Sequence, residues 1–276
     1  MKLLIKLVII ALGLLAALLI VFNLWGRLTL GTLTPDPNAA RNPQANAVVM
    51  VFGATGSVGD GLLKAAMEDP AVKTIHVVTR SSSPRIEAGA ASGRLQVHMH
   101  QDFTDYRDLA GVLGEVNTVL WGLGTSSLNV DDATYTRIHV DFPLAFVGAW
   151  LAERTAGPMS FHYVTGMGTD PDGAQHWARE KGRAERTLAR MAAAGDLRTY
   201  SYRSAFIRPT SEQSNALIYL AEALLKPGYL VIAGRELGQA MLEISARTSE
   251  LPNGTLIDNR DSIDYAHAYQ TAAGIR

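Results

Sequence analysis

The stretch VVMVFGATGSVG, residues 48–59, decides the fold, because an apolar run leads directly into three glycines spaced three residues apart. Gly53 would permit a tight turn off a strand, Gly56 would let a ligand approach the backbone, and Gly59 would let the next helix pack close to the sheet. The unoccupied amides of that helix would then face an anion such as a diphosphate. A glycine-rich turn explains the spacing too, but the strand before it and the amphipathic segment 60–69 after it are the context that the dinucleotide motif requires. We predict dinucleotide contacts from this loop at Gly53, Thr55, Gly56, Ser57, Val58 and Gly59.

The rest of the chain alternates apolar runs with segments of helical period. This alternation is typical of an α/β fold with a Rossmann-like, doubly wound parallel sheet. The predicted strands are 47–52, 74–79, 95–99, 116–121, 160–165 and 200–207, and the predicted helices are 60–69, 133–154, 175–194, 212–225 and 237–247. The segment 255–269 predicts a last strand and a last helix. Residues at about 211–260 would form a small lobe over the ligand cleft, where apolar side chains could line a substrate pocket or simply be buried.

The N-terminus predicts a membrane anchor. Residues 7–25 carry no charge, follow Lys2 and Lys6, and as a helix would reach roughly 28 Å, close to the ~30 Å thickness of the bilayer hydrocarbon. A cleaved signal peptide is the alternative, but the apolar run is longer than usual and no small-x-small site follows Trp25. We therefore predict an anchor at 1–27, a linker at 28–46 and the binding domain at 47–276.

Composition limits the partners of this chain. Its 276 residues have a net charge of −1, and its lysines and arginines are scattered, so we expect no nucleic-acid partner. The chain has no cysteine, which excludes disulfides and thiolate chemistry.

The end of the second predicted strand indicates which dinucleotide is preferred. An NAD-specific site usually has an acidic residue about twenty positions beyond the last glycine, to bind the ribose 2′-hydroxyl. This chain has Arg80 there, followed by three serines. A guanidinium suits a 2′-phosphate, so NADP is predicted in preference to NAD, although a solvated arginine at a strand end is the simpler reading.

Several further motifs stand in a fixed order along the chain: VVTR at 77–80, HQDFTD at 100–105, WGLGTS at 121–126, YVTGMGTD at 163–170 and IRPT at 207–210. Together with GATGSVG, this series resembles the atypical or extended short-chain dehydrogenase/reductases, and in particular their NAD(P)H-binding subgroup with a GATGxxG fingerprint. The resemblance runs from Ala47 to the C-terminus.

The resemblance implies roles for particular residues. Asp102 would meet the adenine amine, Lys181 would hold the nicotinamide ribose, and Thr165 would stand where the family has a serine. Beside the nicotinamide half would lie Gly122, Gly124 and Thr125. Each position has a structural alternative, because Asp102 could cap a helix, the glycines could shape a turn, and a threonine is ordinary in a strand.

One departure from the family concerns catalysis. Where the family has Tyr-x-x-x-Lys, this chain has Trp177 and Lys181. The spacing of four still places both side chains on one face of a helix, but the tyrosine phenol, which exchanges a proton with the substrate, is replaced by an indole. An indole N–H donates a hydrogen bond but does not release its proton near neutral pH. The resemblance thus implies Lys181, Thr165 and Trp177 as the catalytic positions. His176 or Tyr163 could replace the acid, although a structural role explains each of them as well.

Three hypotheses about function follow. The first is a membrane-anchored NADP-dependent oxidoreductase or isomerase that acts on a small, apolar substrate. The second is a non-catalytic dinucleotide-binding sensor or assembly factor of a membrane complex, and the third is a scaffold that has lost the ligand. The charges of Lys2 and Lys6 mildly favour an exported domain. NADP(H) is cytosolic, however, so we predict a single-pass membrane protein whose domain faces the cytoplasm.

Overall fold

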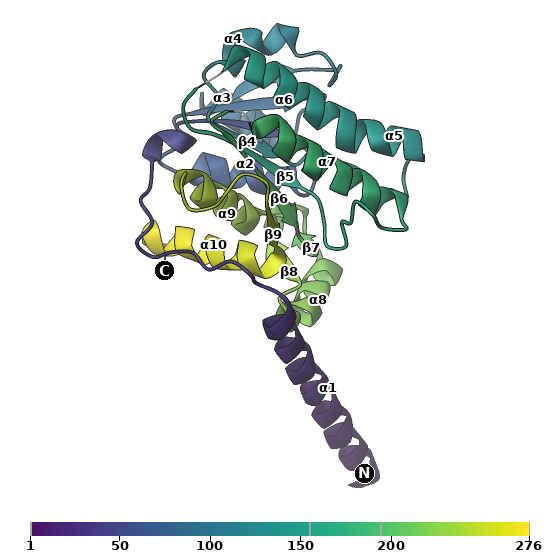
Figure 1. Cartoon of the computed structure of the whole chain (residues 1–276). Helices are drawn as coiled ribbons and strands as arrows, with labels where there is room; N and C mark the ends of the chain where they lie inside the picture. The colour runs from purple at the N-terminus through teal and green to yellow at the C-terminus, as the bar shows by residue number, and fades with distance from the viewer. Residues whose placement is uncertain (1, 155, 194, 276) are drawn as a thin grey trace.

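The computed structural model describes residues 2–154, 156–193 and 195–275 and contains a parallel sheet of seven strands (Figure 1). The order across the sheet is β3-β2-β1-β4-β5-β6-β9. The strands are β1 (Val48–Phe52), β2 (Thr74–Thr79), β3 (Gln96–Met99), β4 (Thr118–Trp121), β5 (Met159–Val164), β6 (Leu197–Arg203) and β9 (Thr255–Asp258). The predicted α/β, Rossmann-like doubly wound sheet is confirmed.

The strand order reverses between β1 and β4, at the middle of the sheet. β1 pairs with β2 on one side, with Val49 opposite Ile75, and with β4 on the other, with Phe52 opposite Trp121. The chain winds outward in opposite directions from these two neighbours, so a crevice opens beyond the carboxyl ends of β1 and β4. Ligands of doubly wound sheets bind in that crevice.

Two apolar layers cover the sheet, and side chains alternate between them as the pleat of a strand requires. Val49 and Val51 of β1 face one layer, whereas Met50 and Phe52 face the other. The first layer holds α2 (Gly59–Glu68), α3 (Pro84–Ala91), α9 (Gly234–Ala246) and α10 (Asn259–Ala272); the second holds α4 (Ala110–Leu113), α6 (Phe142–Glu153) and α7 (His176–Ala192). Figure 1 shows these helices on both sides of the strands.

The predicted helix 133–154 is divided in the structure. It consists of α5 (Asp132–Thr136), a single π-helical turn (Arg137–Asp141) and α6. A π-turn inserts an extra residue into the helix and rotates the side chains that follow. The periodicity of the sequence did not reveal this insertion.

The small lobe is shorter than the sequence indicated. β6 ends at Arg203, and β7 (Phe206–Arg208) pairs with β8 (Val231–Ala233) in a separate two-stranded sheet. Between them lie α8 (Ala216–Leu225) and the 3-10 turn η5 (Lys226–Gly228). α9, which we expected in the lobe, is buried instead between α2 and α10 in the main core. The lobe therefore covers about 206–233 rather than 211–260.

α1 (Lys2–Thr29) projects away from the domain as a single long helix (Figure 1). Its large apolar side chains, among them Ile9, Leu14 and Leu18, are exposed. The helix is long and apolar enough to cross a membrane, a property that an N-terminal signal sequence shares. At about 1.5 Å per residue, it exceeds the ~30 Å of hydrocarbon in a bilayer.

The segment that we predicted as a linker is bound to the domain. The amide of Gly31 donates to Asp258 Oδ2 at 2.7 Å, and the amides of Thr32 and Leu33 both donate to Asp261 Oδ1 at 2.8 Å. Farther along, the 3-10 turn η1 (Pro43–Asn46) contacts α9. These contacts fix the end of α1 against the beginning of α10.

Candidate active site

Three glycines bring the backbones of β1, α2 and β4 into direct contact. Gly53 has a φ of +74°, and a Cβ atom there would lie 2.6 Å from the carbonyl carbon of Gly122. A Cβ at Gly59 would overlap the carbonyl oxygen of Gly53, and one at Gly122 would lie 3.0 Å from the Cα of Gly59. No side chain fits at any of these positions without movement of the backbone.

The loop above these contacts presents free backbone donors. Gly56 closes the turn by donating to the carbonyl of Gly53 at 2.9 Å, and no side chain caps α2. Within the described residues, the amides of Ser57 and Val58 have no hydrogen-bond acceptor. Thr55 is exposed beside them. Two unpaired amides at the positive end of a helix dipole suit an anion such as a diphosphate.

A pocket of about 270 Å³ lies at the crevice between β1 and β4. It brings together many of the residues that the sequence predicted for the dinucleotide. The predicted residues that line it are Gly56, Ser57, Val58, Gly122, Gly124, Thr125 and Lys181, and it is completed by Leu123, Ser126, His139 and Val164. Gly53, Thr55 and Gly59 do not line it, although the backbone of Gly53 packs directly against the lining residue Gly122.

Lys181 reaches the pocket from α7. Its ammonium group donates to the backbone carbonyl oxygen of Thr165. Burial lowers the pKa of Lys181 to about 8, and the carboxylate of Glu185 partly offsets this effect. A lysine with such a pKa can hold or release a proton near neutral pH.

Thr165 does not line the pocket. Its hydroxyl donates to Glu185 Oε1 at 2.8 Å, and Arg203 holds that carboxylate from the other side at 2.6 Å. The preceding residue, Val164, lines the pocket in its place. The hydroxyl at the family's serine position is thus engaged in a buried ion-pair network in this structure.

Trp177 also lies outside the pocket lining. Its indole N–H donates to the side-chain carbonyl of Gln175, and its ring lies against Gly168, where an added Cβ would be 3.3 Å from Cη2. The two other candidate acids are occupied as well. Tyr163 donates its buried hydroxyl to the carbonyl of His139 at 2.7 Å, and His176 Nε2 lies 3.1 Å from Thr136 Oγ1.

His139 is a pocket residue that the sequence analysis missed. It lies on the π-turn, with Nε2 2.9 Å from the carbonyl oxygen of Thr125, and an added Cβ at Gly124 would be 2.8 Å from its Cε1. Burial, together with the charge of Lys181, lowers the pKa of His139 to about 3, so the ring is neutral. The amide of Thr125 also lies 3.2 Å from Nε2, so Nε2 donates to the Thr125 carbonyl in one tautomer and accepts from the Thr125 amide in the other, while Nδ1 is buried without a partner among the described residues. An uncharged histidine in an apolar helical segment gave no sequence signal for this position.

Arg80 and Asp102 lie at the same edge of the sheet but outside this pocket lining. Arg80 follows β2, is exposed, and its guanidinium lies 5.8 Å from the ring centre of Phe103. Asp102 Oδ1 accepts hydrogen bonds from the amide of Thr104 at 3.0 Å and from its hydroxyl at 2.6 Å, which lower the pKa of the carboxyl group. Asp102 shapes its own turn and caps no helix, because the next helical turn begins at Arg107.

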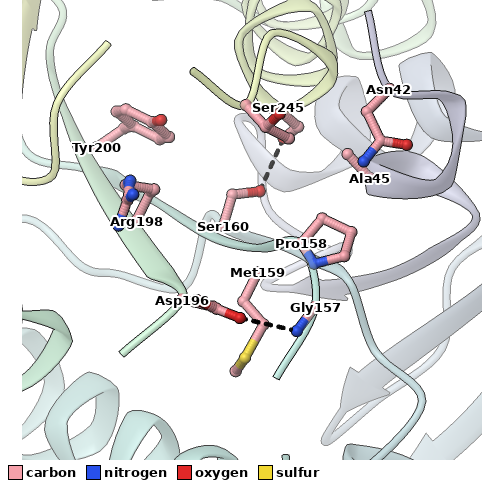
Figure 2. A pocket seen from close by; sticks show the side chains of 11 residues that line it. Asn42, Ala45, Gly157, Pro158, Met159, Ser160, Asp196, Arg198, Tyr200 and Ser245 are labelled. Carbon is pink, nitrogen blue, oxygen red and sulfur yellow. Dashed lines mark hydrogen bonds between the residues drawn. The ribbon is translucent and has the colours of Figure 1, made fainter. Parts of the chain in front are cut away.

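A second hollow of about 220 Å³ lies at the opposite edge of the sheet, where β5 and β6 begin (Figure 2). Ser160, Ser245 and Arg198 are among its lining residues. The two serine hydroxyls lie 2.8 Å apart, and Ser245 Oγ is 2.7 Å from Nε2 of the buried His162. None of the predicted site residues lines this hollow.

Comparisons with known proteins support the fold. No family model matches the chain, and no curated protein matches it. Solved structures do match, among them a short-chain dehydrogenase/reductase from Saccharomyces cerevisiae, with a TM-score of 0.58, 12% identity, and coverage of 78% of this chain and 96% of that one. A 3-oxoacyl-[acyl-carrier protein] reductase from Brucella melitensis in complex with NAD matches with a TM-score of 0.57 and 15% identity, over 79% of this chain and 97% of that one. A UDP-N-acetylglucosamine 4-epimerase from Methanobrevibacter ruminantium M1 matches with a TM-score of 0.56 and 16% identity, over 80% of this chain and 76% of that one. The domain thus has the Rossmann-like fold of the short-chain dehydrogenase/reductases.

Proposed function

We propose that this protein is a membrane-anchored NAD(P)(H)-binding protein and an oxidoreductase of the short-chain dehydrogenase/reductase type. The observation that carries the proposal is that the amides of Ser57 and Val58, which have no acceptor among the described residues, line the same pocket as Lys181. The amides would bind the diphosphate, and Lys181 would bind the nicotinamide ribose. The structural neighbour from Brucella melitensis, which has NAD bound, supports the same assignment.

NADP is the preferred cofactor in this proposal. Arg80 is exposed at the end of β2 and is engaged by no carboxylate among the described residues. Its guanidinium is free to pair with a 2′-phosphate, which an ion-paired arginine would do less well. Asp102 lies three residues beyond the end of β3 at Met99, and its Oδ2, which Thr104 leaves unused, would accept from the adenine amine.

The chemistry would be reduction of a small, apolar carbonyl compound or the reverse oxidation. A bound nicotinamide dinucleotide supplies hydride-transfer chemistry. The chain itself would supply the proton from Lys181 Nζ, whose lowered pKa permits exchange near neutral pH, or would admit water for this purpose. Trp177 stands at the family's tyrosine position, but its N–H is already donated to Gln175.

A non-catalytic role is the second candidate, and a specific observation favours it. Thr165, Trp177 and Tyr163 each donate their polar hydrogen to another group of the protein rather than to the pocket. A dinucleotide-binding sensor, or an assembly factor of a membrane complex, would need the cofactor site without these donors. Binding without turnover would support this candidate.

We further propose that α1 anchors the protein as a single membrane span and that the domain faces the cytoplasm, where NADP(H) is found. A reporter enzyme fused to the C-terminus tests the topology. Activity of the reporter only outside the cytoplasm would contradict both the topology and the supply of cofactor.

Calorimetric titration of the full chain in lipid nanodiscs with NADPH, NADP and NADH tests the proposed function. We expect NADPH to bind in the micromolar range and more tightly than NADH. A folded sample that binds none of the three would contradict the proposal, and binding without oxidation of NADPH by any of a panel of carbonyl compounds and quinones would favour the sensor.

A further inference from the structure

α8 is apolar on nearly every face, yet it is not buried. Leu217 is 75% exposed and Leu220 is 56% exposed, and Tyr219 and Leu224 are exposed as well. No residue of α8 is buried. Contiguous exposed apolar surface of this kind marks a contact with another apolar phase or partner.

The position of α8 is fixed by polar contacts on its inner side. Arg208 forms an ion pair with Glu222 at 2.9 Å, and its guanidinium lies 5.5 Å from the ring centre of Tyr219. At the beginning of the helix, Asn215 Oδ1 accepts from the amides of Leu217 and Ile218 at 3.0 and 3.1 Å. These contacts hold one side of α8 against the domain, while Leu217, Leu220 and Leu224 remain exposed.

α8 leads directly into η5, which packs on the end of α1. A Cβ at Gly228 would overlap the ring of Phe22, and a Cβ at Gly26 would overlap the carbonyl of Gly228. Asn23 Nδ2 donates to the carbonyl of Pro227 at 2.9 Å. Figure 1 shows α8 beside the end of α1 that joins the domain. The apolar surface of the proposed membrane span thus continues onto α8.

Aromatic and basic side chains surround this junction. Trp25 and Lys226 are exposed, and Arg27 donates to the hydroxyl of Tyr229 at 3.2 Å. The guanidinium of Arg260 lies 5.2 Å from the ring centre of Tyr229. Aromatic rings and cations of this kind are enriched where a protein meets the headgroups of a bilayer, and the cations favour anionic lipids.

We infer that α8 lies in the headgroup region of the bilayer, with its leucines in the upper acyl chains, as a second membrane contact beside α1. This inference rests on the proposed membrane anchoring. This contact would bring the lobe to the lipid surface. The ligand crevice would lie there too, because the lobe is bonded to the main domain beside the loop of residues 53–59, which lines the crevice. Thr210 donates to Asp60 Oδ2 on the first turn of α2 at 2.6 Å, and Asn259, the first residue of α10, donates to the carbonyl of Tyr229 at 2.7 Å.

Fluorescence quenching by lipids tests the inference on the full chain. The natural sequence has no cysteine, so single cysteines can be labelled without other changes. Leu217→Cys and Leu220→Cys place an environment-sensitive fluorophore on α8, and Lys73→Cys places it in the exposed turn before β2, at the opposite edge of the sheet. Leu15→Cys reports on α1. The proteins are placed in nanodiscs of phosphatidylcholine and phosphatidylglycerol, with and without nitroxide-labelled acyl chains.

We expect several-fold stronger quenching at Leu217 and Leu220 than at Lys73. If the label at Leu15 is quenched but the labels at Leu217 and Leu220 are quenched no more than the label at Lys73, the inference is overturned and the proposed anchor stands. Absence of quenching at Leu15 would overturn the anchor, and the inference with it. The two α8 labels guard against a local effect of one substitution, and a circular dichroism melt equal to that of the unlabelled chain confirms folding of each variant.

Discussion

The ammonium group of Lys181 is bound to the backbone carbonyl of Thr165, while the side-chain hydroxyl of the same threonine turns away to Glu185. The lysine therefore reaches the pocket, whereas the hydroxyl expected to work beside it does not. This relationship separates the lysine from the hydroxyl at the two positions that the proposed function would pair. On the proposed function, the groups for dinucleotide binding face the pocket, whereas among the described residues Lys181 and the neutral His139 are the titratable groups that line it.

Replacement of Arg80 tests the choice of cofactor. We expect Arg80→Ala to weaken NADPH binding about tenfold or more, since a charge-assisted hydrogen bond contributes roughly 1.5–3 kcal/mol. NADH binding should stay the same, because NADH has no 2′-phosphate. Calorimetry gives both affinities. Arg186→Ala is the matched control, since Arg186 is an exposed arginine of α7 that pairs with Asp172, in the loop before that helix. An equal loss of NADPH and NADH affinity would contradict the assignment.

Replacement of Gly59 tests the close packing beneath the pocket. Gly59→Ala should destabilise the domain by about 1–3 kcal/mol or more, because the new methyl group would overlap the carbonyl of Gly53. Gly111→Ala, on α4, is the control, since a Cβ there has nothing within 4 Å. Thermal denaturation measures both. Equal stability of the two variants would show that the loop can move aside.

Reintroduction of the family's phenol tests the position of residue 177. We expect Trp177→Tyr to leave NADPH affinity unchanged and to produce no rise in turnover, because the side chain at this position lies against Gly168 rather than in the pocket. NADPH oxidation with the same panel of carbonyl compounds is the measurement. A clear gain in kcat would mean that the helix presents residue 177 to the substrate after all.

The titration of Lys181 predicts a pH dependence for binding. Its pKa is lowered to about 8 by burial, so its positive charge is lost as the pH rises through about 8. Affinity for the anionic NADPH should fall across that range, and Lys181→Met should bind more weakly with a flatter pH profile. Lys73→Met, an exposed lysine, is the control. An unchanged profile in Lys181→Met would assign the effect to another group.

The same group predicts the opposite trend for stability. Its pKa is lower in the folded protein than the ordinary 10.5, so below pH 8 the folded state bears the full cost of the buried charge. That cost disappears as the pH rises from about 8 to 10.5, and the ligand-free protein should gain stability from this group over that window. Lys181→Met should be more stable than the natural chain at pH 7 and should lack the gain. Denaturant unfolding at several pH values measures the difference.

The sequence predicted the sheet, and it predicted which loop residues come together at the pocket, because both depend on local patterns. Val48–Phe52 alternates between the two apolar layers, and the glycines after it act through the absence of a side chain. The sequence did not show that Thr165 and Trp177 lie outside the pocket lining. Their side-chain orientations depend on hydrogen bonds to Glu185 and Gln175, which hydrophobic periodicity does not reveal. His139 was missed for a related reason, since a π-turn placed it in the pocket and a regular helix was expected there.

If α1 anchors the protein as we propose, the hydrogen bonds from the amides of Thr32 and Leu33 to Asp261 bear on whether proteolysis can release the domain from the membrane. Proteolysis within an exposed tether releases many anchored domains, but here the segment after the helix is bound along α10 and supplies donors to a carboxylate that is fully buried. A cut between Leu33 and Arg41 would leave those donors on the membrane side and Asp261 without them. On the proposed anchoring, a released form that kept these hydrogen bonds would need the cut before Gly31, directly after the end of α1 at Thr29.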